Sequence, residues 1–134
     1  MSSGKFPLLQ REDERDVEVT WEDQQRINKF SRLNTRLELL EDEYKAQKTE
    51  KEYLDDLATE IELIDEEAVP YKIGDAFVML DLESAQSRVE KDKAAIDLRV
   101  EDLDAQISAV GSEMDELKRA LYAKFGNAIN LEKS

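Results

Sequence analysis

The feature that most constrains this chain is a repeat of apolar residues, at alternating steps of three and four, which begins at Phe30. Such a heptad repeat places the apolar side chains along one side of an α-helix, where a second helix can pack against them. Thr20 followed by Trp21–Asp23 has the pattern of a helix-starting capping box, with Asp in place of the usual Glu. We therefore predict a helix over residues 20–67, which Pro70 ends. Its ten seam positions are Phe30, Leu33, Leu37, Leu40, Tyr44, Gln47, Lys51, Leu54, Ala58 and Ile61.

A second apolar seam follows Asp81, a good helix N-cap, and predicts a helix over residues 81–125. Between Val89 and Ile96 the steps do not fit the repeat, so we expect a shift of register there. With only four Gly and two Pro, the chain is better suited to a few long helices than to a fold with many turns. Because one short connection joins the helices, we expect them to pair antiparallel as a coiled coil within one chain. The second seam consists of Leu82, Ala85, Val89, Ile96, Val100, Leu103, Ile107, Val110, Met114, Leu117 and Leu121.

The segment between the two helices predicts a β-hairpin over residues 69–80. It is rich in β-branched and aromatic residues, and Gly74-Asp75 in its middle is typical of a two-residue turn. A two-stranded sheet is marginally stable by itself and leaves two unpaired edges. We therefore expect it to pair with hairpins of other chains, whereas folding back on its own helices is the alternative. The residues predicted to serve subunit assembly are Val69, Tyr71, Ile73, Phe77, Val78, Met79 and Leu80.

The predicted fold class is thus mainly α: a long antiparallel two-helix coiled coil with one β-hairpin at the bend, which joins an inter-subunit β-barrel. Residues 1–16 show no periodicity and are predicted to be a disordered tail without the features of a signal peptide. Phe6, Leu8 and Leu9 are read as incidental apolar residues, and a short docking segment is the alternative. Residues 17–134 are predicted to form a single domain with a short C-terminal tail after the second helix.

The start of the first helix and the end of the second gather large apolar side chains, and we name this region the tip. Two helices have the least capacity to bury such side chains at their ends, so we expect part of the tip to bind other protein chains. Local packing and helix capping are the alternative interpretation. The residues predicted for client binding are Ile27, Phe30, Leu33, Leu117, Leu121, Tyr122 and Phe125.

Charge is segregated along the chain. Between Gln24 and Leu37 there are four basic residues and no acidic one, whereas Glu52 to Glu67 holds eight acidic residues and no basic one. A basic tip on an acidic chain could attract acidic clients, and a solvated helix face is the alternative interpretation. The four basic tip residues are Arg26, Lys29, Arg32 and Arg36.

The composition excludes several classes of function. The chain has no Cys and no His, which excludes disulfides, Cys/His zinc sites, Cys nucleophiles and Ser-His-Asp triads. A net charge of −14 disfavours nucleic-acid binding, and no apolar run approaches the roughly 18 residues of a membrane span. Acid pairs such as Asp55 and Asp56 are adjacent, so on a helix they point to different faces. We therefore expect no enzyme activity, no cofactor, no metal, and no nucleic-acid or membrane partner.

Three segments resemble the prefoldin family, and its β-class subunits in particular. They are residues 19–30 (VTWEDQQRINKF), 70–77 (PYKIGDAF) and 121–132 (LYAKFGNAINLE), in fitting order and spacing. Two positions depart from the family pattern: Trp21 stands where Phe is expected, and Ala128 where a polar residue is common.

The resemblance implies a subunit of a hexamer with two α-type and four β-type chains, whose hairpins form a double β-barrel. It also implies an ATP-independent co-chaperone in the cytoplasm, with the nucleus as a second location. The implied partners are the other prefoldin subunits, unfolded clients such as actin and tubulin, and the group II cytosolic chaperonin. A structural coiled-coil scaffold or tether protein is the alternative function.

Overall fold

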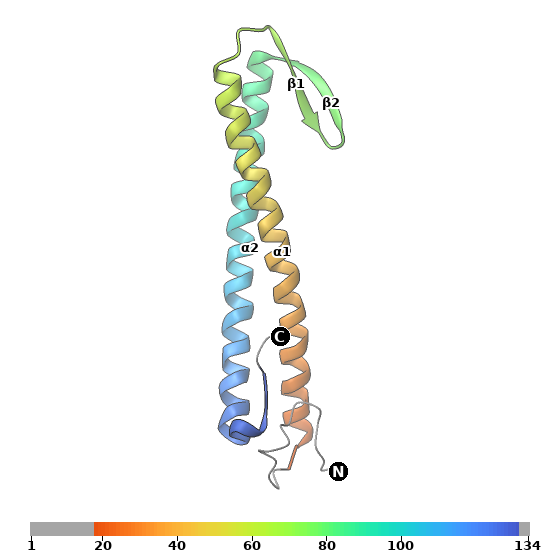
Figure 1. Ribbon diagram of the computed structural model, residues 1–134, viewed down its shortest axis with the longest axis vertical. Helices are drawn as coiled ribbons and strands as arrows, with labels where there is room; N and C mark the ends of the chain where they lie inside the picture. Colours follow the sequence, from red (N-terminus) through yellow and green to blue (C-terminus); the bar gives the residue numbers. More distant parts are fainter. Residues whose placement is uncertain (1–17, 132–134) are drawn as a thin grey trace. The chain divides into compact units, whose positions relative to one another are not determined.

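The computed structural model describes residues 18–131 (Figure 1). Helix α1 (Trp21–Glu62) is followed by strands β1 (Ala68–Ile73) and β2 (Ala76–Asp81), helix α2 (Leu82–Phe125) and a short 3-10 helix, η2 (Gly126–Ala128). Two long helices with a hairpin between them confirm the predicted fold class for a single chain. The predicted N-terminal tail, with Phe6, Leu8 and Leu9, lies outside the described residues. Within residues 18–131, no helix is long and apolar enough to cross a membrane.

The start of α1 confirms the predicted capping box. The backbone N–H of Asp23 donates to the hydroxyl of Thr20 at 3.1 Å, and the backbone N–H of Thr20 donates to the Asp23 carboxylate at 3.0 Å. Each side chain thus satisfies a backbone donor that lacks a partner within the helix. A shorter Asp side chain can therefore replace the usual Glu.

The end of α1 differs from the prediction, because the helix stops at Glu62 and not at residue 67. The N–H of Leu63 bonds to the carbonyl of Glu60 at 3.0 Å, which tightens the final turn. The last turn has no basic residue, and more acidic residues follow it. Because the C-terminal end of a helix dipole is negative, further acidic residues disfavour its extension.

The seam positions predicted for both helices are confirmed, since each is buried or half-buried. Lys51, the charged seam residue of α1, binds Asp97 of α2 at 2.7 Å. Where a register shift was expected in α2, Asp92 and Lys93 are both half-buried. Polar residues at these seam positions are therefore accommodated by bonds to neighbouring elements, as described below for Asp92.

The described chain forms two compact units. One contains residues 18–41 and 105–131, and the other contains residues 42–104 with the hairpin. In the first unit α1 is joined to α2 by an ion pair between Lys29 and Glu113 at 2.6 Å. Each unit has its own apolar cluster, so each can be described separately.

The hairpin turn and the end of α2 both depend on glycine. Gly74 has φ +63° at the first turn position, while Asp75 does not have a positive φ, the pattern of a type II′ turn. The carboxylate of Asp81 accepts a hydrogen bond from the backbone N–H of Ser84 at 2.7 Å and so caps the start of α2, as predicted. Gly126 has φ +56° and reverses the chain after Phe125, so it serves as the C-cap of α2.

Candidate functional site

The tip contains an apolar cluster built from three separate stretches of the chain. Residues before and early in α1 meet the end of α2, and the segment after Gly126 packs against both. Figure 1 shows this last segment turning back and running beside the helices. The buried members of the tip cluster are Val19, Ile27, Phe30, Leu121, Phe125, Ile129 and Leu131, with Met114, Leu117 and Tyr122 packed against them.

Four of the seven predicted client-binding residues are buried in the tip cluster. Ile27 is 5% exposed and Leu121 only 1%, and Phe30 and Phe125 are also buried. The remaining three residues, Leu33, Leu117 and Tyr122, are half-buried. Leu33 lies outside the tip cluster, whereas Leu117 and Tyr122 belong to its edge. Client binding by these residues stays a prediction.

The segment after α2, which was predicted to be a short tail, contributes to this cluster. Ile129 has extended backbone angles (φ −126°, ψ 142°), and its side chain is buried. Leu131 is also buried, whereas Asn130 between them is exposed. The segment therefore inserts alternate side chains into the tip, which supplies the burial that two helix ends alone could not.

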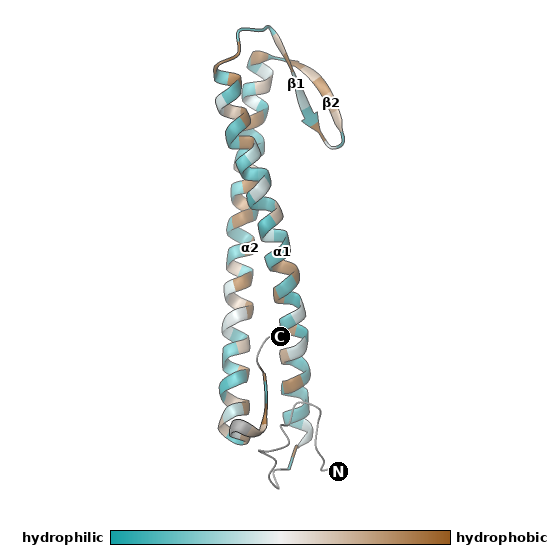
Figure 2. Cartoon of the chain, viewed as in Figure 1, coloured by the Kyte–Doolittle hydropathy of each residue, from teal (hydrophilic) through white to brown (hydrophobic). Residues whose placement is uncertain are grey.

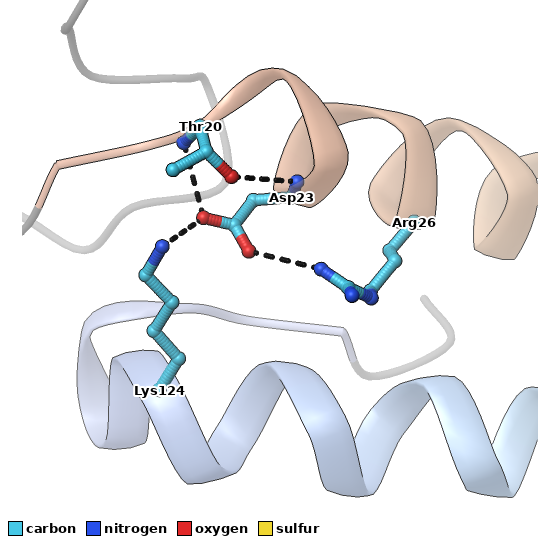
Figure 3. Close-up of polar contacts among 4 residues, drawn as sticks. All are labelled: Thr20, Asp23, Arg26 and Lys124. Atoms are coloured by element: carbon cyan, nitrogen blue, oxygen red, sulfur yellow. Dashed lines mark hydrogen bonds and ion pairs between the residues drawn. The ribbon is translucent and has the colours of Figure 1, made fainter.

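Asp23 is the one buried charged residue among residues 18–131, at 3% exposure. Its carboxylate accepts hydrogen bonds from the Lys124 ammonium and the Thr20 backbone, and Arg26 lies 3.3 Å away (Figure 3). Burial by itself would raise the pKa of Asp23, but the hydrogen bonds from Lys124 and Thr20 outweigh it and lower that pKa. This network ties the first turn of α1 to the last turn of α2.

The four basic tip residues differ in how they are engaged. Arg26 pairs with Asp23, Lys29 pairs with Glu113, and Arg36 donates to Gln106 at 2.8 Å. Arg32 is exposed and makes no ion pair within the described part of the chain. Three of the four charges therefore support the tip's own structure, and Arg32 is the most available to a partner.

Trp21 is the exposed aromatic residue of the tip, at 69% exposure. It is the first residue of α1, so the preceding Thr20 and the following Asp23 are used for capping while its indole faces solvent. The sequence places Trp21 at the start of the first helix, but Trp21 is not among the residues predicted for client binding. Its position outside the heptad seam was the available signal that it would remain exposed.

One face of the hairpin packs on the helices of its own chain. Val69 and Tyr71 of β1 are buried in a cluster with Ile61 of α1 and with Ala85 and Val89 of α2. The alternative of a hairpin folded back on its own helices therefore holds for this face. The side chains of Val69 and Tyr71, which were predicted to serve subunit assembly, are therefore already buried against the helices of their own chain.

The buried Tyr71 is also hydrogen-bonded to α2. Its hydroxyl donates to Asp92 at 2.9 Å, and Arg88 donates to the same carboxylate at 3.1 Å. Burial first, and then the bond to Asp92, raise the pKa of Tyr71 above its ordinary value. Asp92 stands where the second seam shifts register, so this polar seam position holds the hairpin against the helix.

The other face of the hairpin is exposed and apolar. Residues opposite one another across antiparallel strands share a face, which places Met79 beside Pro70 and Phe77 beside Lys72. Phe77 is 67% exposed and Met79 is similarly open, and β2 is white to brown along most of its length in Figure 2. The remaining predicted assembly residues share the face of Val69 and Tyr71, where Ile73 and Val78 are exposed and Leu80 is half-buried.

A cofactor or metal would require convergent polar ligands. Among residues 18–131 there is no group of three or more His, Cys, Asp or Glu side chains that could hold a metal ion.

Comparison with known proteins gives consistent matches over most of the chain. The Prefoldin_2 family model, described as a prefoldin subunit, matches residues 24–128. Prefoldin subunit 4 of Saccharomyces cerevisiae is 45% identical over 127 residues, which cover 94% of this chain and 98% of that protein. Prefoldin subunit 4 of Homo sapiens is 38% identical over 119 residues, which cover 87% of this chain and 89% of that protein.

A solved structure shows the same fold. The crystal structure of the prefoldin beta subunit from Thermococcus strain KS-1 matches with a TM-score of 0.70 and 14% sequence identity. The match covers 82% of this chain and 97% of that chain. At this identity the likeness concerns the fold, with two long helices and one hairpin between them.

Proposed function

Because this chain belongs to the prefoldin family and is a subunit of the prefoldin co-chaperone, we propose that its tip holds unfolded proteins for transfer to the group II cytosolic chaperonin. Its partners are other prefoldin subunits, in a hexamer of two α-type and four β-type chains. Actin and tubulin are the proposed clients, and the cytoplasm, with the nucleus as a second location, is the proposed place of action. Binding and release need no ATP.

The division of apolar surface between the hairpin and the tip supports this proposal. The hairpin exposes Phe77 and Met79, while Val69 and Tyr71 on its other face are buried on the chain's own helices. An exposed apolar strand with free edges is suited to pairing with another hairpin, which would bury the side chains and satisfy the edges. We assign this surface to subunit assembly in a β-barrel.

The tip supports the client-holding part of the proposal. It combines the exposed Trp21 with the apolar tip cluster and the exposed Arg32. Aromatic and arginine side chains are common in protein interfaces. A client held weakly at several tips of one hexamer gains avidity, yet each contact can be released in turn. Transfer to a chaperonin requires both properties: a client that is held by several tips together, and single contacts that are weak enough to be released.

Site-specific crosslinking of a reconstituted hexamer tests the proposal. A photoreactive residue at Trp21 or Arg32 is expected to crosslink chemically unfolded actin, whereas the same residue at Ile73 of the hairpin is not. Leu98, which is exposed on α2 outside both surfaces, is the matched control. Equal crosslinking from Leu98 and Trp21 would show that clients do not select the tip.

A further inference from the structure

The tip cluster is completed by a piece of extended chain. Ile129 and Leu131 are buried in it at 2% and 4% exposure, and the backbone at Ile129 is extended. The N–H of Leu131 donates to the hydroxyl of Tyr122 at 3.3 Å. An extended segment that inserts alternate apolar side chains between helix ends has the same form as a segment of an unfolded protein.

The segment is attached so that it can leave the helices without breaking them. Gly126, with φ +56°, ends α2 and begins the reversal, and α2 itself is complete at Phe125. Movement about Gly126 would uncover Ile27, Phe30 and Leu121, since these residues share the cluster with the segment. These are the apolar residues that the sequence places at the client-binding tip.

We propose that residues 126–131 occupy the client site in the free protein, and that an extended client segment with alternating apolar side chains displaces them on binding. This inference rests on the proposed client-holding function. Exchange of one apolar segment for another leaves the burial of the tip nearly unchanged. Binding to each tip is therefore weak, because the free energy of client burial is offset by the loss of the resident segment.

Hydrogen exchange on the wild-type hexamer tests the displacement directly. Chemically unfolded actin is added, and exchange is followed by mass spectrometry in the peptide that covers residues 126–131. The expected result is faster exchange in this peptide when actin is bound, together with slower exchange around Ile27 and Phe30. Unchanged or slower exchange at residues 126–131 in the actin complex overturns the inference.

A substitution provides a second test. Leu131→Asp cannot place its charge in the apolar cluster, so the segment is expected to open, and the hexamer to bind unfolded actin about tenfold more tightly. Leu39→Asp introduces the same change on an exposed residue of the same unit and is expected to bind as wild type. Wild-type or weaker binding by a Leu131→Asp protein with native helicity argues against displacement.

The two proposals fail in different ways. A wild-type hexamer that binds no unfolded actin overturns the proposed function, and the inference with it. A hexamer that binds actin while residues 126–131 remain protected overturns only the inference. If Leu131→Asp does not fold, the exchange measurement on the wild-type protein decides the question.

Discussion

The hydroxyl of Tyr71 lies 2.9 Å from Oδ2 of Asp92, so the hairpin is hydrogen-bonded to α2 of its own chain. Tyr71 is among the most buried residues of the described chain, and Asp92 is also engaged by Arg88. The hairpin is thus positioned before any other subunit is present. Assembly can then use the face that remains exposed, without first ordering the strands.

Tyr71→Phe is expected to lower the free energy of unfolding by about 1 kcal/mol, since it removes one buried hydrogen bond and keeps the ring. Urea-induced unfolding of the isolated chain, followed by circular dichroism, measures this. Tyr53→Phe is the matched control, because Tyr53 is exposed on α1 in the same unit. Equal effects of the two substitutions would contradict a stabilising Tyr71–Asp92 bond.

Alkaline pH is expected to destabilise the hairpin unit. The pKa of Tyr71 is raised in the folded chain, so its neutral form contributes stability fully below the unfolded pKa, about 10. That contribution is lost as pH rises from about 10 toward the folded pKa. The difference in unfolding free energy between wild type and Tyr71→Phe should therefore shrink above about pH 10. A difference that is constant through this range would be inconsistent with the raised pKa.

Asp23→Ala is expected to lower the free energy of unfolding by about 2 kcal/mol, because it removes the capping box and the bond to Lys124. The pKa of Asp23 is lowered on folding, so this contribution is complete above the unfolded pKa, about 3.9, and is lost as pH falls further. Thermal unfolding at pH 7 and at pH 3 measures both effects.

Glu22→Ala is the control for this prediction, since Glu22 is adjacent and acidic but exposed. Its effect should be a few tenths of a kcal/mol, from the helix dipole alone. If Asp23→Ala were no more destabilising than Glu22→Ala, the network at the tip would contribute nothing to stability.

Phe77→Asp is expected to weaken assembly with the other prefoldin subunits by on the order of tenfold or more, because a carboxylate would be buried in the interface. Helicity of the isolated chain should be unchanged, since Phe77 is largely exposed there. Light scattering after size-exclusion chromatography of mixed subunits measures the hexamer. Leu98→Asp is the control and should assemble normally. Normal assembly by Phe77→Asp would show that the exposed hairpin face is not part of the interface.

Arg32→Glu is expected to slow the capture of an acidic unfolded client by on the order of threefold at low salt. The difference should diminish in 0.5 M salt, where the charges of tip and client are screened. Stopped-flow mixing with a fluorescently labelled client gives the rate. Lys45→Glu makes the same charge change on an exposed residue of the other unit, and identical rates for both variants would exclude a role for the basic tip.

Much of the fold could be predicted because its signals are local. The three-and-four spacing identified the buried side of each helix, since helical periodicity depends only on the backbone. Thr20, Gly74, Asp81 and Gly126 marked turns and caps through their own side chains or lack of one. The end of α1 was less predictable, because no Gly or Pro stops the helix at Glu62.

The candidate sites were predicted only in part. The sequence located the apolar residues of the hairpin and the tip, but not which of them are covered. Val69 and Phe77 have the same apolar character, yet one is buried by α1 and α2 and the other faces solvent. Their difference depends on which face of the hairpin meets the helices, and local pattern does not contain that information.

By itself, then, the sequence determined two long helices, a hairpin between them, a capped start and a prefoldin-like order of segments. Only the tertiary structure decided that Tyr71 is held by Asp92 and that Ile129 and Leu131 cover the tip. The physical reason is that periodicity and capping act over a few neighbouring residues. Burial of one segment by another depends instead on the path of the chain between them.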